Sequence, residues 1–384
     1  MDDSQSPAAL LARLGSLLNT PPASVEILPG DGSDWPPDWL GNAGLEQDHR
    51  PFLYVDGHLG VPQKVLYRTY LVAVREFMRL RSGLQNIEAG SPEARRLKHL
   101  TAVILLANPA HQTALNTRKR LVSSGVLDAT NELQLCTALL VVRECSKESL
   151  LWHHRRWLLC QAHELLNTGA KICRKGDSLR NIALSADSLR SEFSVATQAC
   201  ETYPRNYFAW AHRYLCLEAL TLHACSSSPS SHSCRSVLLE ELLFARKWVE
   251  RHVSDYTAVH YLHNMHVLLL QGDNIPLPEN ASSALEIDRV DHRSLRASLY
   301  AHAKSLVAAY PEHESMWLYL RAAIDVCGSD PTFRLGETAI CEDCKSARSS
   351  KAHSPLHCAS ATHAERHQAW LHHIRQTNVR ISER

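Results

Sequence analysis

The sequence of 384 residues lacks the features that mark several familiar classes of protein. Its 41 basic and 40 acidic side chains leave almost no net charge, so we expect no nucleic-acid or membrane-surface role driven by charge. No apolar run reaches the roughly 20 residues that span a bilayer, and the first residues lack the basic flank and apolar core of a signal peptide. Glycine-rich nucleotide loops, a Ser-His-Asp set and paired catalytic carboxylates are also missing.

The 12 cysteines are scattered along the chain and are not spaced as the disulfide framework of a small domain. Scattered thiols of this kind are typical of a reducing compartment, so we expect a cytoplasmic protein. Hydrophobic residues make up 45% of the chain, which is enough to bury a large core.

One cluster near the C-terminus has the formal spacing of a two-Cys, two-His zinc finger: Cys341, Cys344, His357 and His363. The intervening residues lack the aromatic and the leucine that build the small core of such a finger. The cluster also lies in a segment rich in His and Ser, where an insertion between repeats is expected. We therefore predict that this chain binds no metal ion, with zinc at these four residues as the alternative.

What the chain does contain is a degenerate motif that recurs six times, clearest at Pro204-Arg205-Asn206-Tyr207-Phe208-Ala209-Trp210-Ala211-His212-Arg213. The copies align on a central aromatic or apolar residue, which we call the anchor. In three copies a proline stands six residues before the anchor, and in three an arginine stands three residues after it. A fixed pattern of this kind is typical of helical-hairpin repeats. The anchors are Leu115, Trp152, Trp210, Val259, Trp317 and Trp370.

Each position of the motif has a physical reason to begin a helix. Proline presets a helical backbone angle where the first amides have no internal partner. Residues such as Asn206 and Asp255 can then cap those amides. The anchor falls about one turn into the helix, and the arginine three residues later shares its face. We interpret six residues as structural anchors of the repeats: Trp152, Arg155, Trp210, Arg213, Trp317 and Trp370.

Apolar residues at helical spacing precede the motifs and predict a partner helix for each. We therefore predict an all-α fold, an α-α superhelix in which TPR-like helical hairpins form a right-handed crescent over residues 61–378. Residues 1–60 are rich in Pro and Gly and are interpreted as an extended or loosely packed N-terminal arm. The expected partner helices are 61–80, 93–107, 131–142, 190–200, 236–253 and 294–309, and loop insertions are expected near 170–185, 224–235, 272–290 and 330–362.

The repeated motif resembles the protein prenyltransferase α-subunit repeat over residues 60–378. Its most specific segments are Glu148-Ser149-Leu150-Leu151-Trp152-His153-His154-Arg155-Arg156-Trp157-Leu158 and the Pro204 to Arg213 copy. The resemblance implies a crescent of hairpins wrapped around a separate β subunit, which holds the catalytic zinc and the isoprenoid pocket. This chain would then be the α-like subunit of a heterodimeric protein prenyltransferase and would be inactive alone.

The resemblance also implies roles for three residues at the rim of a shared active site. Arg205 would stabilise the isoprenoid diphosphate, and Tyr207 and Phe208 would contact substrate. The residues alone give an independent argument for Arg205. A cation in the first helical turn opposes the helix dipole by about 0.3–1 kcal/mol, whereas free amides and an arginine together can hold an anion. The alternatives are a solvated Arg205, a Tyr207 that packs on a neighbouring hairpin, and a structural His212.

The Arg205-Asn206 pair resembles the Rab-type geranylgeranyl transferase α subunit, so the resemblance favours geranylgeranyl over farnesyl as the lipid. The implied partners are a β subunit of the Rab geranylgeranyl type and protein substrates with C-terminal cysteines, with geranylgeranyl diphosphate as co-substrate. The alternative is a non-catalytic helical-repeat scaffold. Some copies depart from the motif, which favours the scaffold: Leu115 and Val259 replace the anchor Trp, and Leu262 and Leu320 replace the Arg.

Overall fold

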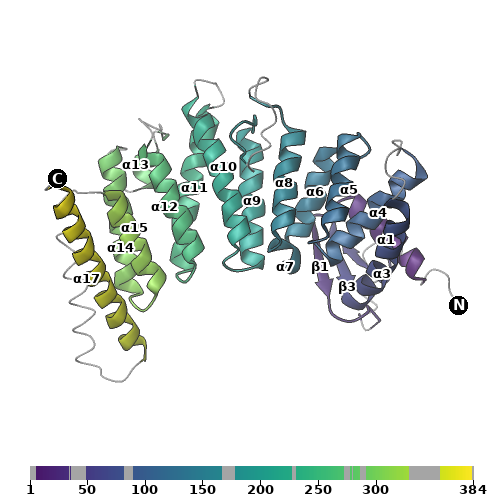
Figure 1. Ribbon diagram of the computed structural model, residues 1–384, viewed down its shortest axis with the longest axis horizontal. Helices are drawn as coiled ribbons and strands as arrows, with labels where there is room; N and C mark the ends of the chain where they lie inside the picture. Colours follow the sequence, from purple (N-terminus) through teal and green to yellow (C-terminus); the bar gives the residue numbers. More distant parts are fainter. Residues whose placement is uncertain are drawn as a thin grey trace. The chain divides into compact units, whose positions relative to one another are not determined.

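The computed structural model describes residues 6–33, 35, 49–81, 90–166, 178–226, 231–271, 277–278, 280–285, 291–327 and 355–382. Most of these residues are helical (Figure 1), which confirms the predicted all-α helical-repeat class. The chain divides into two compact units. The first unit is Met1–Leu184 with Arg190–Cys216, and the second is Ser185–Leu189 with Leu217–Arg384. Helices α9 (Ala186–Thr202) and α10 (Tyr207–Cys225) contribute residues to both.

The helices of the first unit follow the predicted pairing. Helix α3 (Gln63–Leu80) packs against α4 (Pro92–Ala107), and α4 packs against α5 (Gln112–Ser123). Helix α6 (Ala129–Leu140) packs against α8 (Ser149–Ala162), with the short helix α7 (Arg143–Ser146) between them in the chain. The helices expected at 61–80, 93–107, 131–142 and 190–200 are therefore confirmed.

The second unit is built in the same way. Helix α11 (Ser231–Arg251) packs against α12 (Tyr256–Gln271), and α15 (Glu314–Cys327) packs against both α12 and α14 (His292–Ala309). Helix α17 (Pro355–Ser382) packs on α15, and the single turn α13 (Ala281–Ala284) precedes α14. The expected helices at 236–253 and 294–309 are confirmed.

The interpretation of residues 1–60 as a loose arm is wrong for its described part. Helix α1 (Pro7–Asn19) begins after Ser6, whose Oγ accepts a hydrogen bond from the Ala9 amide at 3.2 Å. One face of α1 is buried against α3 and α4, and at Gly15 an added Cβ would stand 2.5 Å from the Cβ of His99. Proline breaks a helix from within, but after a capping serine it starts one. The buried leucines of α1 are Leu10, Leu11, Leu14 and Leu18.

A small sheet in the order β1-β3-β2 follows α1. Strand β1 (Ser24–Leu28) runs parallel to β3 (His58–Pro62), and β2 (Leu53–Val55) pairs with β3 in antiparallel fashion. The β2–β3 hairpin turns at Asp56 and Gly57, whose φ angles are 50° and 83°. Two left-handed residues in an Asp-Gly pair are the typical two-residue hairpin turn. The Asp56-Gly57 pair could have predicted this hairpin, but the prolines nearby favoured the interpretation as an extended arm.

Two of the expected insertions are shorter than predicted. Helix α10 extends to Cys225 and α11 begins at Ser231, so most of 224–235 is helical. Helix α17 begins at Pro355, inside the insertion expected at 330–362. At the base of the insertion near 170–185, Leu165 and Ile182 form an isolated antiparallel bridge. Residues 167–177, 272–276, 286–290 and 328–354 lie outside the described residues.

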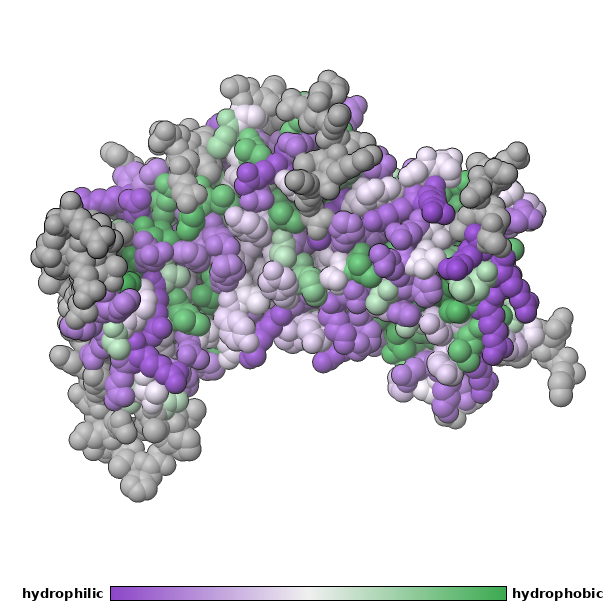
Figure 2. All heavy atoms as spheres, viewed as in Figure 1, coloured by the Kyte–Doolittle hydropathy of each residue, from purple (hydrophilic) through white to green (hydrophobic). Residues whose placement is uncertain are grey.

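The surface of the described residues mixes hydrophilic and hydrophobic side chains. On the face shown in Figure 2, hydrophilic residues cover much of the surface and hydrophobic ones reach it in small groups. Within the part of the chain that the structure describes, no helix combines the length and the apolar character needed to cross a membrane.

We expect Leu14→Ala to lower the free energy of unfolding by about 2–5 kcal/mol, because it removes a fully buried side chain from the contact of α1 with α3 and α4. Leu71→Ala on α3 is the matched control, since Leu71 is 38% exposed. Urea unfolding of both variants measures the difference. Equal, small losses would mean that α1 does not belong to the cooperative core.

Candidate functional site

Three anchor tryptophans are buried in the first turns of their helices, as predicted. Trp152, Trp210 and Trp317 stand at the fourth position of α8, α10 and α15 and are at most 4% exposed. Trp152 Nε1 donates a hydrogen bond to the Ser146 carbonyl, and Trp317 Nε1 donates one to the Pro311 carbonyl, both at 2.8 Å. In both, the acceptor lies six residues before the anchor. The anchor therefore also fixes the turn that leads into its own helix.

Trp370 does not follow this pattern. Helix α17 begins at Pro355, so Trp370 lies in the middle of a long helix and is only half-buried. The fully buried residue nearby is His367, whose ring centroid lies 5.4 Å from that of Trp317 and 5.6 Å from that of Trp370. The interpretation of Trp370 as a buried anchor equivalent to the others is therefore wrong.

The arginine of the motif forms a buried ion pair with a glutamate of the next helix along the chain. Arg155 on α8 donates two hydrogen bonds to Glu192 on α9, each 2.7 Å long. His212, two residues after the anchor of α10, contacts the same carboxylate with Nε2 at 2.9 Å. His212 is thus a structural residue, the alternative that its sequence context left open.

The preceding repeat contains the same three-residue cluster. Arg118 on α5 pairs with Glu132 on α6, and His154 on α8 contacts Glu132 at 3.2 Å. All three side chains are at most 4% exposed. We call the two sets, Arg118-Glu132-His154 and Arg155-Glu192-His212, the buried triads.

Each motif arginine also binds the helix before its own. Arg118, Arg155 and Arg213 donate through Nη1 to Thr101, Thr137 and Thr197 respectively, each at 2.9 Å. In the buried triads the guanidinium therefore joins the helices on both sides of its own, and the glutamate joins one hairpin to the next. Sequence reasoning missed these glutamates, although Glu132-x4-Thr137 and Glu192-x4-Thr197 repeat a detectable pattern.

The charges of the buried triads can be assigned from their surroundings. Burial alone would raise the pKa of Glu192, but Arg155 and His212 outweigh it and lower the pKa to about 2. Glu132 behaves in the same way beside Arg118 and His154, again with a pKa of about 2. Burial lowers the pKa of both histidines despite their carboxylate partners. The stable state is therefore an ionised Arg–Glu pair with a neutral histidine that donates to the carboxylate.

In the second unit, different residue types stand two and three residues after the anchor, where the first unit has histidine and arginine. Tyr261, two residues after Val259, donates to Glu241 at 2.6 Å, and the Tyr319 hydroxyl lies 2.8 Å from His302 Nδ1. Leu262 and Leu320 take the place of the arginine and are fully buried. In these two repeats apolar packing therefore replaces the ion pair.

The turn before α10 carries the residues that the sequence suggested for substrate binding. The buried residue of this turn is Asn206, whose side chain is 1% exposed. Asn206 Oδ1 accepts a hydrogen bond from the Ala209 amide at 3.2 Å, and Nδ2 donates to the Ser146 carbonyl at 2.7 Å. That carbonyl also accepts from Trp152, so the turn is tied to the end of α7. Asn206 is the predicted helix cap.

Arg205 lies outside the helix, contrary to the prediction of a cation in its first turn. Helix α10 begins at Tyr207, and Arg205 precedes the cap with φ of 59°. A left-handed backbone is uncommon for a residue with a side chain and stores strain of about 1–3 kcal/mol. Its side chain is exposed. Arg205 thus precedes the helix as an exposed residue and does not lie on it.

The neighbouring residues complete an exposed, cation-bearing rim. Tyr207 is 66% exposed, so packing against a neighbouring hairpin does not account for it. Its ring contacts that of Phe208 edge to face, with centroids 5.4 Å apart. The Arg143 guanidinium and the Lys147 ammonium lie 5.5 and 5.6 Å from the Tyr203 ring centroid. Two cations of α7 and its end thus stand near the same turn.

Among the described residues, no group of three or more His, Cys, Asp or Glu side chains could hold a metal ion. Cys341 and Cys344 of the formal zinc-finger pattern lie outside the described residues, as does the side chain of His357. Only His363 is described, on α17. The prediction that this chain binds no metal therefore stays a prediction.

One segment of the chain matches a known protein family. Residues 189–220, which include the whole Pro204 to Arg213 motif, match the family described as "Protein prenyltransferase alpha subunit repeat". Residues 189–220 are therefore similar to a prenyltransferase alpha subunit repeat. This match confirms the resemblance inferred from the motif for that segment.

Similar curated proteins are named "Protein prenyltransferase alpha subunit repeat-containing protein 1". The chain is 29% identical to the one from Danio rerio over 241 residues, which cover 59% of this chain and 53% of that protein. It is 27% identical to the one from Homo sapiens over 240 residues, which cover 58% of this chain and 57% of that protein. The chain thus spans about half the length of the curated relatives it matches.

We expect Glu192→Gln to lower the free energy of unfolding by about 3–5 kcal/mol, because it leaves the buried charge of Arg155 without a counter-ion. Glu201→Gln on the same helix is the control, since Glu201 is exposed. Chemical unfolding of both variants is the measurement. A loss in Glu192→Gln no larger than in the control would contradict the structural role of the Arg155-Glu192-His212 triad.

Stability should fall as the pH is lowered below neutrality. The buried histidines have a lower pKa in the folded protein than their ordinary value of 6.5, so the unfolded chain takes up protons first and is favoured below that pH. The glutamates add to the loss as the pH falls from about 4.5 toward their folded pKa of about 2. Unfolding free energies measured from pH 7.5 to 5 should decrease. His212→Gln keeps a donor for Glu192 and should flatten that slope, and an unchanged slope would contradict the assignment.

Proposed function

We propose that this chain is the α-like subunit of a heterodimeric protein prenyltransferase, with geranylgeranyl as the transferred lipid. The observation that carries the proposal is the turn before α10. It combines an exposed Arg205 and an exposed Tyr207 with a buried Asn206, and it lies inside the matched alpha subunit repeat. A turn that is fixed by a buried asparagine and exposes a cation and an aromatic ring is suited to contact a ligand held by a partner subunit.

The role proposed for Arg205 is to stabilise the diphosphate as it leaves the isoprenoid. The bond that breaks joins the first isoprenoid carbon to the diphosphate oxygen, and the new bond joins that carbon to a cysteine sulfur of the protein substrate. Negative charge grows on the departing oxygen, and a fixed cation there lowers the barrier more than it strengthens substrate binding. Tyr207 and Phe208 would line the same rim. A zinc-bearing β subunit, of the Rab geranylgeranyl type, would hold the lipid and activate the thiol.

A non-catalytic scaffold is the second candidate, and one observation favours it. In the second unit, buried Leu262 and Leu320 replace the motif arginine, so those repeats have diverged from the first unit. Helical repeats serve as protein-binding surfaces without catalytic residues. The scaffold and the enzyme subunit differ in whether the complex consumes isoprenyl diphosphate.

The central test is prenyl transfer by the chain co-expressed with candidate β subunits. In single-turnover reactions at saturating lipid, Arg205→Ala should slow transfer by a factor on the order of 10²–10³. Arg205→Lys should recover much of the rate because it restores the charge. The stability of the fold should be unaffected, because the Arg205 side chain is exposed. Arginine and alanine both carry a Cβ, so the left-handed backbone at this position is about equally strained with either residue.

Arg95→Ala on α4 is the matched control, because Arg95 is also an exposed cation of the first unit. It should leave the rate unchanged. Equal rates for wild type and Arg205→Ala would refute the role of Arg205. No transfer with any β subunit, together with stable binding of another protein, would favour the scaffold.

A further inference from the structure

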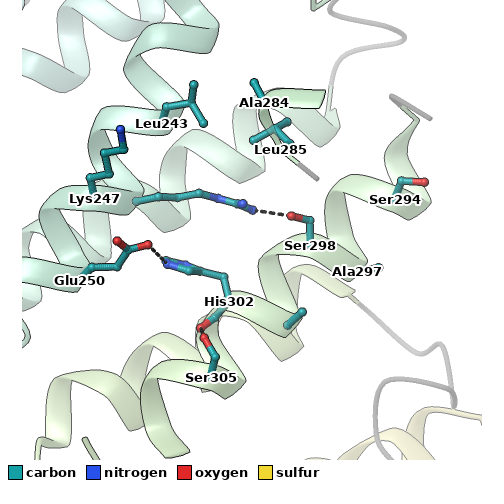
Figure 3. Close-up of a pocket in the computed structure, with 12 residues that line it drawn as sticks. Leu243, Lys247, Glu250, Ala284, Leu285, Ser294, Ala297, Ser298, His302 and Ser305 are labelled. Atoms are coloured by element: carbon teal, nitrogen blue, oxygen red, sulfur yellow. Dashed lines mark hydrogen bonds and ion pairs between the residues drawn. The ribbon is translucent and has the colours of Figure 1, made fainter. Parts of the chain in front are cut away.

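The second unit contains a pocket of about 720 Å³ between α11, α13 and α14. This volume is in the range of small-molecule sites, roughly 300–1,000 Å³. Figure 3 shows two different ends. Leu243, Ala284 and Leu285 lie together at one end, and Glu250, His302 and Ser305 lie at the other.

Arg246 lines this pocket and forms no ion pair with an acidic side chain among the described residues. Its Nη2 donates to the neutral hydroxyl of Ser298 at 2.9 Å, whereas its buried Nε has no hydrogen-bond partner within the described structure. Burial lowers the pKa of Arg246, and the nearby Tyr319 and Glu250 offset this only in part. A guanidinium in a pocket usually has a carboxylate or phosphate to bind, because its five donors match that planar arrangement.

The charges of the described residues around the pocket compensate this cation only in part. Lys247 lines the same pocket and is exposed. Among the described lining residues the one carboxylate is that of Glu250, which lies 3.0 Å from His302 Nε2, and His302 Nδ1 contacts the Tyr319 hydroxyl. Behind the pocket, burial and the charge of Arg246 lower the pKa of His266 to about 3, so this neighbour is neutral. Among the described residues, Arg246 and Lys247 therefore line the space with Glu250 as a single carboxylate, which leaves one net positive charge.

The remaining polar groups in the middle of the pocket are hydroxyls. Ser298 accepts from Arg246, so its own O–H can donate to a ligand, and Ser294 lines the pocket one turn earlier on α14. Two cations with hydroxyl donors suit a doubly charged, multiply accepting group such as phosphate better than a single carboxylate. The adjacent leucines offer an apolar contact for an organic substituent.

We propose that this pocket binds a small phosphate monoester. Its phosphate contacts Arg246, Lys247 and Ser298, and its organic group contacts Leu243 and Leu285. The site lies wholly in the second unit, whereas Arg205 and Tyr207 belong to the first. The inference therefore does not rest on the proposed prenyltransferase role.

Isothermal titration of the full chain with phenyl phosphate, inorganic phosphate and phenol tests the proposal. Phenyl phosphate should bind more tightly than inorganic phosphate, and phenol should not bind. Arg246→Gln and Lys247→Gln should each weaken phenyl phosphate binding by about tenfold to a hundredfold, as expected for the loss of one charge-assisted contact. Arg293→Gln, an exposed cation on α14 that does not line the pocket, should bind as the wild type does.

Thermal unfolding of each variant checks that the fold is intact. Because Lys247 is exposed, its variant remains informative even if Arg246→Gln disturbs the packing of α11 against α14. The proposal is overturned if the wild type binds no phenyl phosphate at millimolar concentration. It is also overturned if phenol competes equally, or if both pocket variants bind as tightly as Arg293→Gln. No partner subunit or isoprenoid is present, so failure here leaves the prenyl-transfer test untouched.

Discussion

The buried pairing of a motif arginine with a glutamate on the next helix is the interaction on which the first unit depends. A charge at these positions is stable only with its counter-ion in place, because each side chain is removed from water. The pair therefore fixes the spacing and rotation of successive hairpins more strictly than apolar packing, which tolerates small shifts. The histidine of the following motif completes the acceptor capacity of the carboxylate and extends the link to a third helix.

This constraint explains how the turn before α10 can be exposed and yet well defined. Arg155 and His212 hold α8, α9 and α10 through Glu192, while Asn206 and Trp152 share the Ser146 carbonyl. With both the helices and the turn fixed, Arg205 can occupy a left-handed conformation that a looser loop would abandon. The same turn lies within the segment that matches the prenyltransferase alpha subunit repeat, so the structural and the proposed functional parts of the motif are adjacent.

The two units have used the same hairpin in different ways. In the first, buried ion pairs join successive hairpins in addition to apolar packing. In the second, leucine replaces arginine and tyrosine replaces histidine at the same motif positions. Arg246 on α11 is outside any buried ion pair among the described residues, and it lines the pocket between α11 and α14.

The sequence by itself determined the helical repeats, their approximate bounds, the buried Trp152, Trp210 and Trp317, and the cap at Asn206. Each follows from local rules, namely apolar spacing at the helical period and capping of free amides. The prolines of residues 1–60 suggested that no helix or strand forms there, and this interpretation was wrong for α1 and for the hairpin at Asp56. Ser6 caps the start of α1, and Gly57 completes the hairpin turn. Only the tertiary structure decided that Arg205 stands outside its helix, that Trp370 is not a buried anchor, and that Glu132 and Glu192 complete the buried triads. Those outcomes depend on which residues of different helices meet, and a spacing such as Glu-x4-Thr along one helix does not identify the partner on another.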